Sequence, residues 1–304
     1  MMKRSASANS KGSRLLTAAG LLLAGIAAFR LCGIGIAYQS GLAFYRRLAQ
    51  AARPGADTKR GAAPAGDEGS GGAAELSAGG SDRGAEIDFS YLKRLNPDIV
   101  GWLSFDSGDI SYPVLQGADN TEYLYTMADG SKNDAGSIFI DALCGADFED
   151  MHTILYGHNR KDLTMFGRLK LYASDPSYYK ENRFFTIDTP EGTFRYEVFA
   201  WYEAAEDDAV YQVGFAADQA FAEFTAQMKQ RSDYDTGVSV DGSDKIVTLS
   251  TCSSAGRRFI VHGKRMRGEK NETGRVKADT GEDAEGYAGR QIKMAHGGAD
   301  NRGK

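Results

Sequence analysis

The sequence predicts a mostly β domain with a few helices. Short runs of β-branched and aromatic residues recur through the middle of the chain, and Gly, Pro, Asp or Asn separates most of them. Two segments with helical periodicity interrupt these runs. Such a mixture fits a closed β-barrel decorated by helices. The predicted strands are 99–105, 112–115, 137–140, 152–156, 184–189, 193–202, 245–250 and 259–263.

The two helical segments are 87–95 and 218–229, and the second places Phe221, Phe224 and Met228 on one face. A Thr-Pro-Glu-Gly run at 189–192 predicts a hairpin turn between two strands. Aromatic residues crowd the region from 178 to 201. A sugar-binding face is one interpretation of them, but their spacing favours core and cross-strand packing.

Composition divides the 304 residues unevenly. The stretch 51–86 is dominated by Ala, Gly, Ser and Asp, and 268–304 is polar and Gly-rich, so neither can bury enough apolar surface to fold. We expect a flexible tether over 39–86, a folded domain over 87–267 and a flexible tail over 268–304. The domain, at about 180 residues, is long enough for one well-buried core.

The N-terminus predicts a membrane segment. Residues 1–14 carry Lys3, Arg4, Lys11 and Arg14 with no acid, and an apolar stretch then continues to residue 38, interrupted by Arg30. We therefore expect a basic N-terminus over 1–14 and an uncleaved anchor over 15–38. A signal peptide whose apolar region ends near residue 27 is the alternative.

Three side chains at strand ends suggest a nucleophilic site. The run Thr-Leu-Ser-Thr-Cys at 248–252 ends one predicted strand with Cys252. The run Tyr-Gly-His-Asn follows another and contains His158, and Arg258 opens a third. A lone cysteine is most often a small buried hydrophobe, but a thiol, an imidazole and a guanidinium together make a plausible site for covalent catalysis.

Five motifs in order resemble the sortase family, most closely its class B. They are the run at 248–252 with its trailing arginine, Tyr-Gly-His-Asn with the later Met-Phe-Gly at 165–167, and the runs at 96–103, 115–120 and 136–141. The resemblance covers about residues 87–266. It implies a closed eight-stranded β-barrel with N-terminal and peripheral helices, a cytoplasmic N-terminus and a catalytic domain outside a bacterial cell membrane.

The resemblance also implies an activity. Such enzymes are cysteine transpeptidases that cleave a C-terminal sorting motif of secreted proteins after its Thr and hold the protein as a thioester. An amine of a peptidoglycan precursor or of a pilin then resolves the thioester. The partners expected here are those proteins, that amine and the membrane. No cofactor, metal or nucleic acid is expected, in keeping with the formal net charge of −5 and the absence of an acidic metal-binding motif.

Carried over by motif, Cys252 is the nucleophile, His158 the acid and base, and Arg258 the stabiliser of the oxyanion. Arg257 is a rival for the last role because the connection from Cys252 is short, and strict alternation lets only one of the two arginines reach the site. The resemblance assigns substrate contacts to three residues: Asn120, Leu124 and Ser250.

Other interpretations stay open at this point. Cys144 is expected to be a core or loop residue, and a disulfide with Cys252 would silence the site. A cysteine peptidase of the cell envelope would share the thiol and the imidazole but would not require Arg258. A surface assembly module with a vestigial site is the alternative that is not an enzyme.

Overall fold

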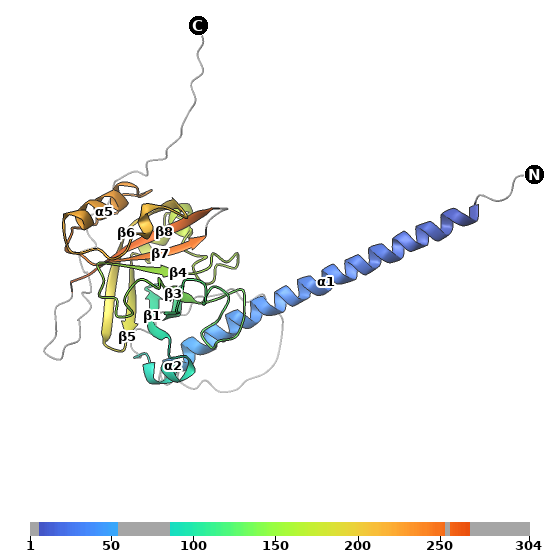
Figure 1. The fold of residues 1–304 in the computed structure, drawn as a ribbon, viewed down its shortest axis with the longest axis horizontal. Coiled ribbons are helices and arrows are strands. Elements are labelled where there is room, and N and C mark those ends of the chain that lie inside the picture. The colour runs from blue at the N-terminus through green and yellow to red at the C-terminus, as the bar shows by residue number, and fades with distance from the viewer. Residues whose placement is uncertain (1–5, 54–85, 253–255, 268–304) are drawn as a thin grey trace, which may run out of the picture.

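A computed structural model describes residues 6–53, 86–252 and 256–267. Two helices precede the sheet: α1 (Ala6–Ala51) projects away from the rest of the molecule, and α2 (Phe89–Leu95) lies beside its C-terminal end (Figure 1). Asp88 caps α2, because its carboxylate accepts the Tyr91 backbone N–H at 2.8 Å. The chain then enters the first strand directly.

Eight strands form a closed barrel in the order β1-β2-β3-β4-β7-β8-β6-β5. This confirms the mostly β prediction and the closed eight-stranded barrel. Five of the strands have bounds within one residue of their predicted bounds at both ends; β6, β7 and β8 run further. The strands are β1 (Ile99–Phe105), β2 (Ser111–Leu115), β3 (Ile138–Ile140), β4 (His152–Tyr156), β5 (Phe184–Thr189), β6 (Gly192–Ala205), β7 (Ile246–Cys252) and β8 (Arg257–Arg265).

Two pairings in the barrel are parallel and the rest are antiparallel. The predicted hairpin turn joins β5 to β6, where Thr189 pairs with Gly192 and only two residues lie between them. The parallel pairs are β2 with β3 and β4 with β7. The pairing of β4 with β7 matters most for function, because both strands end at residues of the predicted site.

The barrel has apolar packing on both sides of its wall. Inside, Leu103, Phe185 and Leu249 are fully buried. Outside, α5 (Gln219–Gln230) covers β6, β7 and β8, and its Phe221 packs with Phe199 of β6 in a second cluster. The aromatic residues between 178 and 201 belong to this packing; Phe185 stacks on Tyr196 across β5 and β6 at 5.1 Å, as cross-strand packing predicts. Three short helical segments complete the fold: α3 (Leu171–Ser174), α4 (Tyr178–Glu181) and η2 (Ala209–Tyr211).

The N-terminal part differs from its prediction in one respect. Residues 39–53 were expected in a flexible tether, but α1 continues to Ala51 and buries Tyr45 and Leu48 in the core. The Tyr45 hydroxyl donates to the Gly136 carbonyl at 2.6 Å. This end of the helix therefore belongs to the folded domain, because apolar side chains on one of its faces find partners there.

The remaining predictions for the ends of the chain receive no support from the structure. Among the described residues, no helical stretch combines the length and the apolar character needed to cross a membrane, which leaves the anchor predicted at 15–38 unsupported. Residues 1–5 of the basic segment, 54–85 of the predicted tether and the predicted tail at 268–304 lie outside the described residues.

Candidate active site

His158 lies in the loop that follows β4. Gly157 brings it close to β7: its N–H donates to the Ser250 carbonyl at 3.2 Å. A Cβ at position 157 would lie 2.7 Å from the ring of the buried Phe166 and 2.4 Å from the Ile138 side chain, so this close approach favours glycine. The loop then folds back on itself, and the Phe166 N–H donates to the His158 carbonyl at 3.0 Å. The Tyr-Gly-His-Asn and Met-Phe-Gly motifs are thus two halves of one turn.

The contacts of His158 determine which of its ring nitrogens is free. Nε2 lies 2.6 Å from the Leu124 carbonyl oxygen. A carbonyl oxygen can only accept, so Nε2 carries a hydrogen and donates it. The lone pair of the neutral ring is therefore on Nδ1. The ring also packs against Tyr125, with centroids 5.4 Å apart, and the imidazole is half-buried. Nδ1 is the nitrogen available for proton transfer.

The strand register places Cys252 between His158 and Arg258. In the parallel pair, Tyr156 of β4 is level with Ser250 of β7, and the Gly157 N–H still bonds to the Ser250 carbonyl, so His158 follows beside the last residues of β7. In the antiparallel pair on the other side, Cys252 is directly opposite Arg258 of β8. Adjacent strands lie about 4.8 Å apart. Three neighbouring strand ends therefore bring positions 158, 252 and 258 together in the fold.

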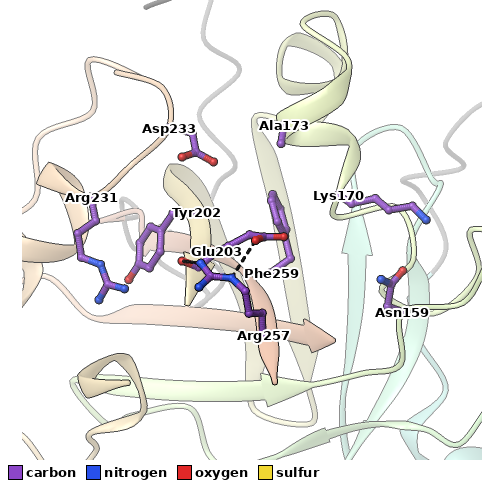
Figure 2. A pocket seen from close by; sticks show the side chains of 9 residues that line it. All are labelled: Asn159, Lys170, Ala173, Tyr202, Glu203, Arg231, Asp233, Arg257 and Phe259. Atoms are coloured by element: carbon purple, nitrogen blue, oxygen red, sulfur yellow. Dashed lines mark hydrogen bonds and ion pairs between the residues drawn. The ribbon is translucent and has the colours of Figure 1, made fainter. Parts of the chain in front are cut away.

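The two candidate arginines have different surroundings. Arg258 is partly buried, and its Nη1 lies 2.8 Å from Glu206, directly after the end of β6. Arg257 is exposed and its Nε lies 3.0 Å from Glu203 (Figure 2). Residues directly opposite in an antiparallel ladder lie on the same face of the sheet, and it is Arg258 that is opposite Cys252. The register thus favours Arg258 over Arg257.

Of the predicted substrate residues, Leu124 and Ser250 lie beside His158 and its neighbour Gly157, and the side chains of Ser250 and Asn120 already have hydrogen-bond partners. Leu124 provides the carbonyl that accepts from His158. Ser250 is buried, and its hydroxyl lies 3.0 Å from the hydroxyl of Tyr211. Asn120 donates its amide N–H to Asp141 at 2.9 Å, and its amide oxygen accepts the Ala142 N–H at 2.8 Å. The Asn120 side chain thus organises the loop around it.

Sequence reasoning missed several residues that contact the predicted site residues or their neighbours. Asp141 is buried and accepts from both Asn120 and the Tyr156 hydroxyl, at 2.9 and 2.8 Å. Burial, followed by this bond, raises the pKa of Tyr156 well above its usual range. Tyr156 and Asp141 belong to motifs already singled out, which was a usable signal. Tyr211 and Glu206 lie outside every motif, and nothing in the sequence indicates them.

Cys144 is not part of the site. It is a free, buried thiol whose sulfur lies 3.6 Å from the His152 carbonyl oxygen. Burial raises its pKa to about 11, so the thiolate is scarce at neutral pH. The possible disulfide between Cys144 and Cys252 is therefore wrong. Within the described part of the chain, no group of three or more His, Cys, Asp or Glu residues could hold a metal ion.

A buried hydrogen-bond relay runs from strand to strand along the barrel wall near the site. His152 Nε2 lies 2.7 Å from the Thr248 hydroxyl, which lies 2.9 Å from His262 Nδ1. His262 Nε2 in turn lies 2.9 Å from the Tyr202 hydroxyl. Burial lowers the pKa of His152 to about 4 and that of His262 well below 6.5. Both rings are therefore neutral, and the relay ties together β4, β7, β8 and β6, the strands that carry or support the site.

Comparison with known proteins identifies the family. A family model described as the sortase domain matches residues 103–266. The chain belongs to the sortase family. Sortase B of Listeria monocytogenes is 37% identical over 177 residues, which are 57% of this chain and 72% of that protein. Sortase B of Staphylococcus aureus is 35% identical over 180 residues, 58% of this chain and 73% of that protein.

Solved structures agree with this assignment. A structure described as the Staphylococcus aureus sortase B-substrate complex superposes with a TM-score of 0.56 and 33% identity, covering 59% of this chain and 84% of that one. The likeness to class B that the motifs predicted is confirmed. The chain is a sortase B-type cysteine transpeptidase, and its family acts at the bacterial cell envelope on substrates that carry sorting motifs.

Proposed function

We propose that Cys252 is the nucleophile, His158 the proton carrier and Arg258 the stabiliser of the oxyanion. The observation that supports this proposal is that position 252 is directly opposite position 258, while β4, which leads into His158, runs parallel beside β7. A thiol near its ordinary pKa is only slightly ionised at neutral pH, so the nucleophile requires a neighbouring cation. Protonated His158 and Arg258 are the two cations adjacent to it in the register.

The reaction follows from these positions. The Cys252 thiolate attacks the carbonyl carbon of the Thr in the sorting motif, and Arg258 donates hydrogen bonds to the oxygen that becomes negative. The C–N bond breaks as His158 gives its Nδ1 proton to the departing amine, which leaves a thioester. The acceptor amine then attacks the thioester carbon and passes a proton to His158, and the C–S bond breaks to release Cys252.

The acyl donor is proposed to be a C-terminal sorting motif, cleaved after its Thr. Asn120, Leu124 and Ser250 are proposed as its contacts, and the support is that Leu124 bonds to His158 and Ser250 bonds to the neighbouring Gly157. Since the side chains of Asn120 and Ser250 already have partners, both would act mainly by holding the binding surface in shape. The amine acceptor is proposed to be a peptidoglycan precursor or a pilin lysine.

Attachment to the membrane, with the N-terminus in the cytoplasm and the catalytic domain outside, also remains a proposal. Its support is a set of large apolar side chains on α1 that are at least half exposed: Leu21, Leu22, Leu23, Ile26 and Phe29. Exposed apolar side chains gathered on one helix favour contact with lipid. Cell fractionation of the full chain and of a form that begins at residue 39 tests it. Equal recovery of both forms in the membrane fraction would contradict the proposal.

Incubating the protein with a library of sorting peptides and amines, and detecting products by mass spectrometry, tests the transpeptidase proposal. We expect joined peptide–amine products from the wild type and from Cys144→Ala, and none from Cys252→Ala. Arg258→Ala should lose transpeptidation. Retained hydrolysis of unrelated peptides by Arg258→Ala would instead favour a cysteine peptidase.

A further inference from the structure

Tyr45 lies near the C-terminal end of α1, where this helix meets the barrel (Figure 1). Its buried hydroxyl donates to the Gly136 carbonyl at 2.6 Å and lies 3.0 Å from the Ser137 hydroxyl. Burial raises the pKa of Tyr45 well above its usual range, so the hydroxyl keeps its hydrogen at any pH at which the protein is folded. Tyr45 is therefore a permanent donor to the segment that leads into β3.

Gly136 lies against the carbonyl group that fixes the tautomer of His158. The φ angle of Gly136 is +56°, and a Cβ at this position would lie only 2.2 Å from the Leu124 carbonyl oxygen. That same oxygen accepts the hydrogen of His158 Nε2 at 2.6 Å. The peptide group that Tyr45 holds is therefore packed directly on the acceptor of the imidazole.

Ser137 holds the residues on both sides of Leu124. Its N–H donates to the Tyr123 carbonyl at 3.0 Å, and its hydroxyl donates to the Thr126 carbonyl at 2.8 Å. Ser137 is buried, so these bonds are shielded from water. The Tyr45 and Ser137 hydroxyls thus form one contact that determines where the Leu124 carbonyl lies.

A second contact of Tyr45 reaches the loop that contains His158. The Tyr45 ring packs edge-on against Tyr112, with centroids 5.4 Å apart, and the Tyr112 hydroxyl accepts the Met165 N–H at 3.1 Å. Met165 has a φ angle of +52°, which is unfavourable for a residue with a side chain and persists only where its surroundings hold it. The next N–H, that of Phe166, donates to the His158 carbonyl. Tyr45 therefore supports the loop of the imidazole as well as its acceptor.

We propose that Tyr45 is a positioning residue for the reaction, which holds the Leu124 carbonyl in place and thereby fixes the His158 imidazole with Nδ1 free. The inference rests on the proposed role of His158 as the proton carrier. Because Tyr45 belongs to α1, this helix then contributes to the catalytic centre and not only to the packing of the fold.

Tyr45→Phe removes the hydroxyl and keeps the ring, and the tautomer of His158 reports the result. Long-range ¹H–¹⁵N spectra of the full chain labelled with ¹⁵N-histidine show which ring nitrogen carries the hydrogen, and comparison with His158→Gln assigns the signals. We expect the wild type to hold the Nε2–H tautomer alone. Tyr45→Phe should show a mixture of both tautomers, because the Leu124 carbonyl is no longer held against the ring.

Steady-state kinetics of the full chain give the second measurement. The kcat of Tyr45→Phe should fall roughly tenfold, since a small displacement of the proton carrier slows the chemical step. Ser137→Ala should have the same effect. The double variant should lose little more than either single variant, because the two hydroxyls belong to one contact.

Tyr172→Phe is the matched control. The Tyr172 hydroxyl donates to the Asn182 carbonyl at the same distance of 2.6 Å, and both tyrosines are 4% exposed. Tyr172 lies on α3 and packs against Trp201 instead. Tyr172→Phe should therefore lose about as much stability in urea as Tyr45→Phe but keep both the tautomer and kcat.

An unmixed tautomer in Tyr45→Phe, with a kcat no lower than that of Tyr172→Phe, would overturn the inference. The activity of His158→Gln distinguishes this failure from that of the proposed function. If His158→Gln is inactive while Tyr45→Phe behaves like its control, only the positioning role is wrong. If His158→Gln retains transpeptidation, the proposed role of His158 is wrong, and a mixed tautomer in Tyr45→Phe would still support the positioning.

Discussion

Thr248→Val interrupts the buried relay beneath the site at its centre. The His152 Nδ1 lies 2.7 Å from the Gln212 carbonyl, which can only accept, so Nδ1 carries the hydrogen and Nε2 accepts from Thr248. The Thr248 hydroxyl has one hydrogen, so it accepts from His262 Nδ1. The substitution leaves an unpaired acceptor on His152 and an unpaired donor on His262.

The expected loss of stability follows from these two unpaired groups. A buried polar group without a partner costs about 1–3 kcal/mol, so two of them cost about 2–6 kcal/mol. Valine has nearly the shape of threonine, so loss of packing contributes little. Urea unfolding, followed by the fluorescence of Trp102 and Trp201, measures the free energy of unfolding.

Thr153→Val is the matched control. Thr153 is also buried in the barrel wall, on β4, but its hydroxyl has no hydrogen-bond partner among the described residues. Removing the Thr153 hydroxyl leaves no other polar group unpaired, so Thr153→Val should be neutral or should stabilise the fold by about 1 kcal/mol. If Thr248→Val cost less than about 1 kcal/mol, or no more than Thr153→Val, the relay would not stabilise the barrel as argued.

Two further outcomes are expected. The unfolded chain protonates His152 near its ordinary pKa of 6.5 and the folded chain only near 4, so this ring alone contributes about 3 kcal/mol of stability above pH 6.5 that is lost as the pH drops to 4. The lowered pKa of His262 adds a loss of the same sign, and a free energy of unfolding that stays flat over this window would contradict the neutral burial of these rings. Glu206→Gln keeps an oxygen near Arg258 but removes the negative charge that pairs with this arginine, so kcat should fall severalfold. Glu203→Gln disturbs only Arg257 and should change kcat little. Equal effects of the two variants in steady-state kinetics would show that Arg258 has no special role.

The strands were predictable because each is a short apolar run with clear boundaries. The bounds of β4 and β5 match the predicted 152–156 and 184–189. β6 and β8 extend past their predicted ends, to Ala205 and back to Arg257. Those extra residues include charged ones such as Glu203, and they are strand residues because the partner strand pairs with them. Local composition cannot indicate pairing of this kind.

The arrangement of the site was predictable only through the family resemblance. Periodicity alone does not reveal that β4 lies parallel to β7, whose residues are more than 90 positions away in sequence. Nor does it reveal that Glu206 pairs with Arg258. The packed end of α1 was missed because Ala-rich sequence near Tyr45 resembles the tether that follows it, and burial of Tyr45 depends on a distant partner, Gly136.

The acyl-enzyme tests the central claim most directly. The full chain is exposed briefly to a sorting peptide that it cleaves, quenched in acid, and mapped by mass spectrometry after digestion. We predict an acyl group on Cys252 that hydroxylamine removes, that is absent from Cys252→Ala and that still forms in Cys144→Ala. Cleavage without any adduct on Cys252, or an adduct that persists in Cys252→Ala, would contradict the account.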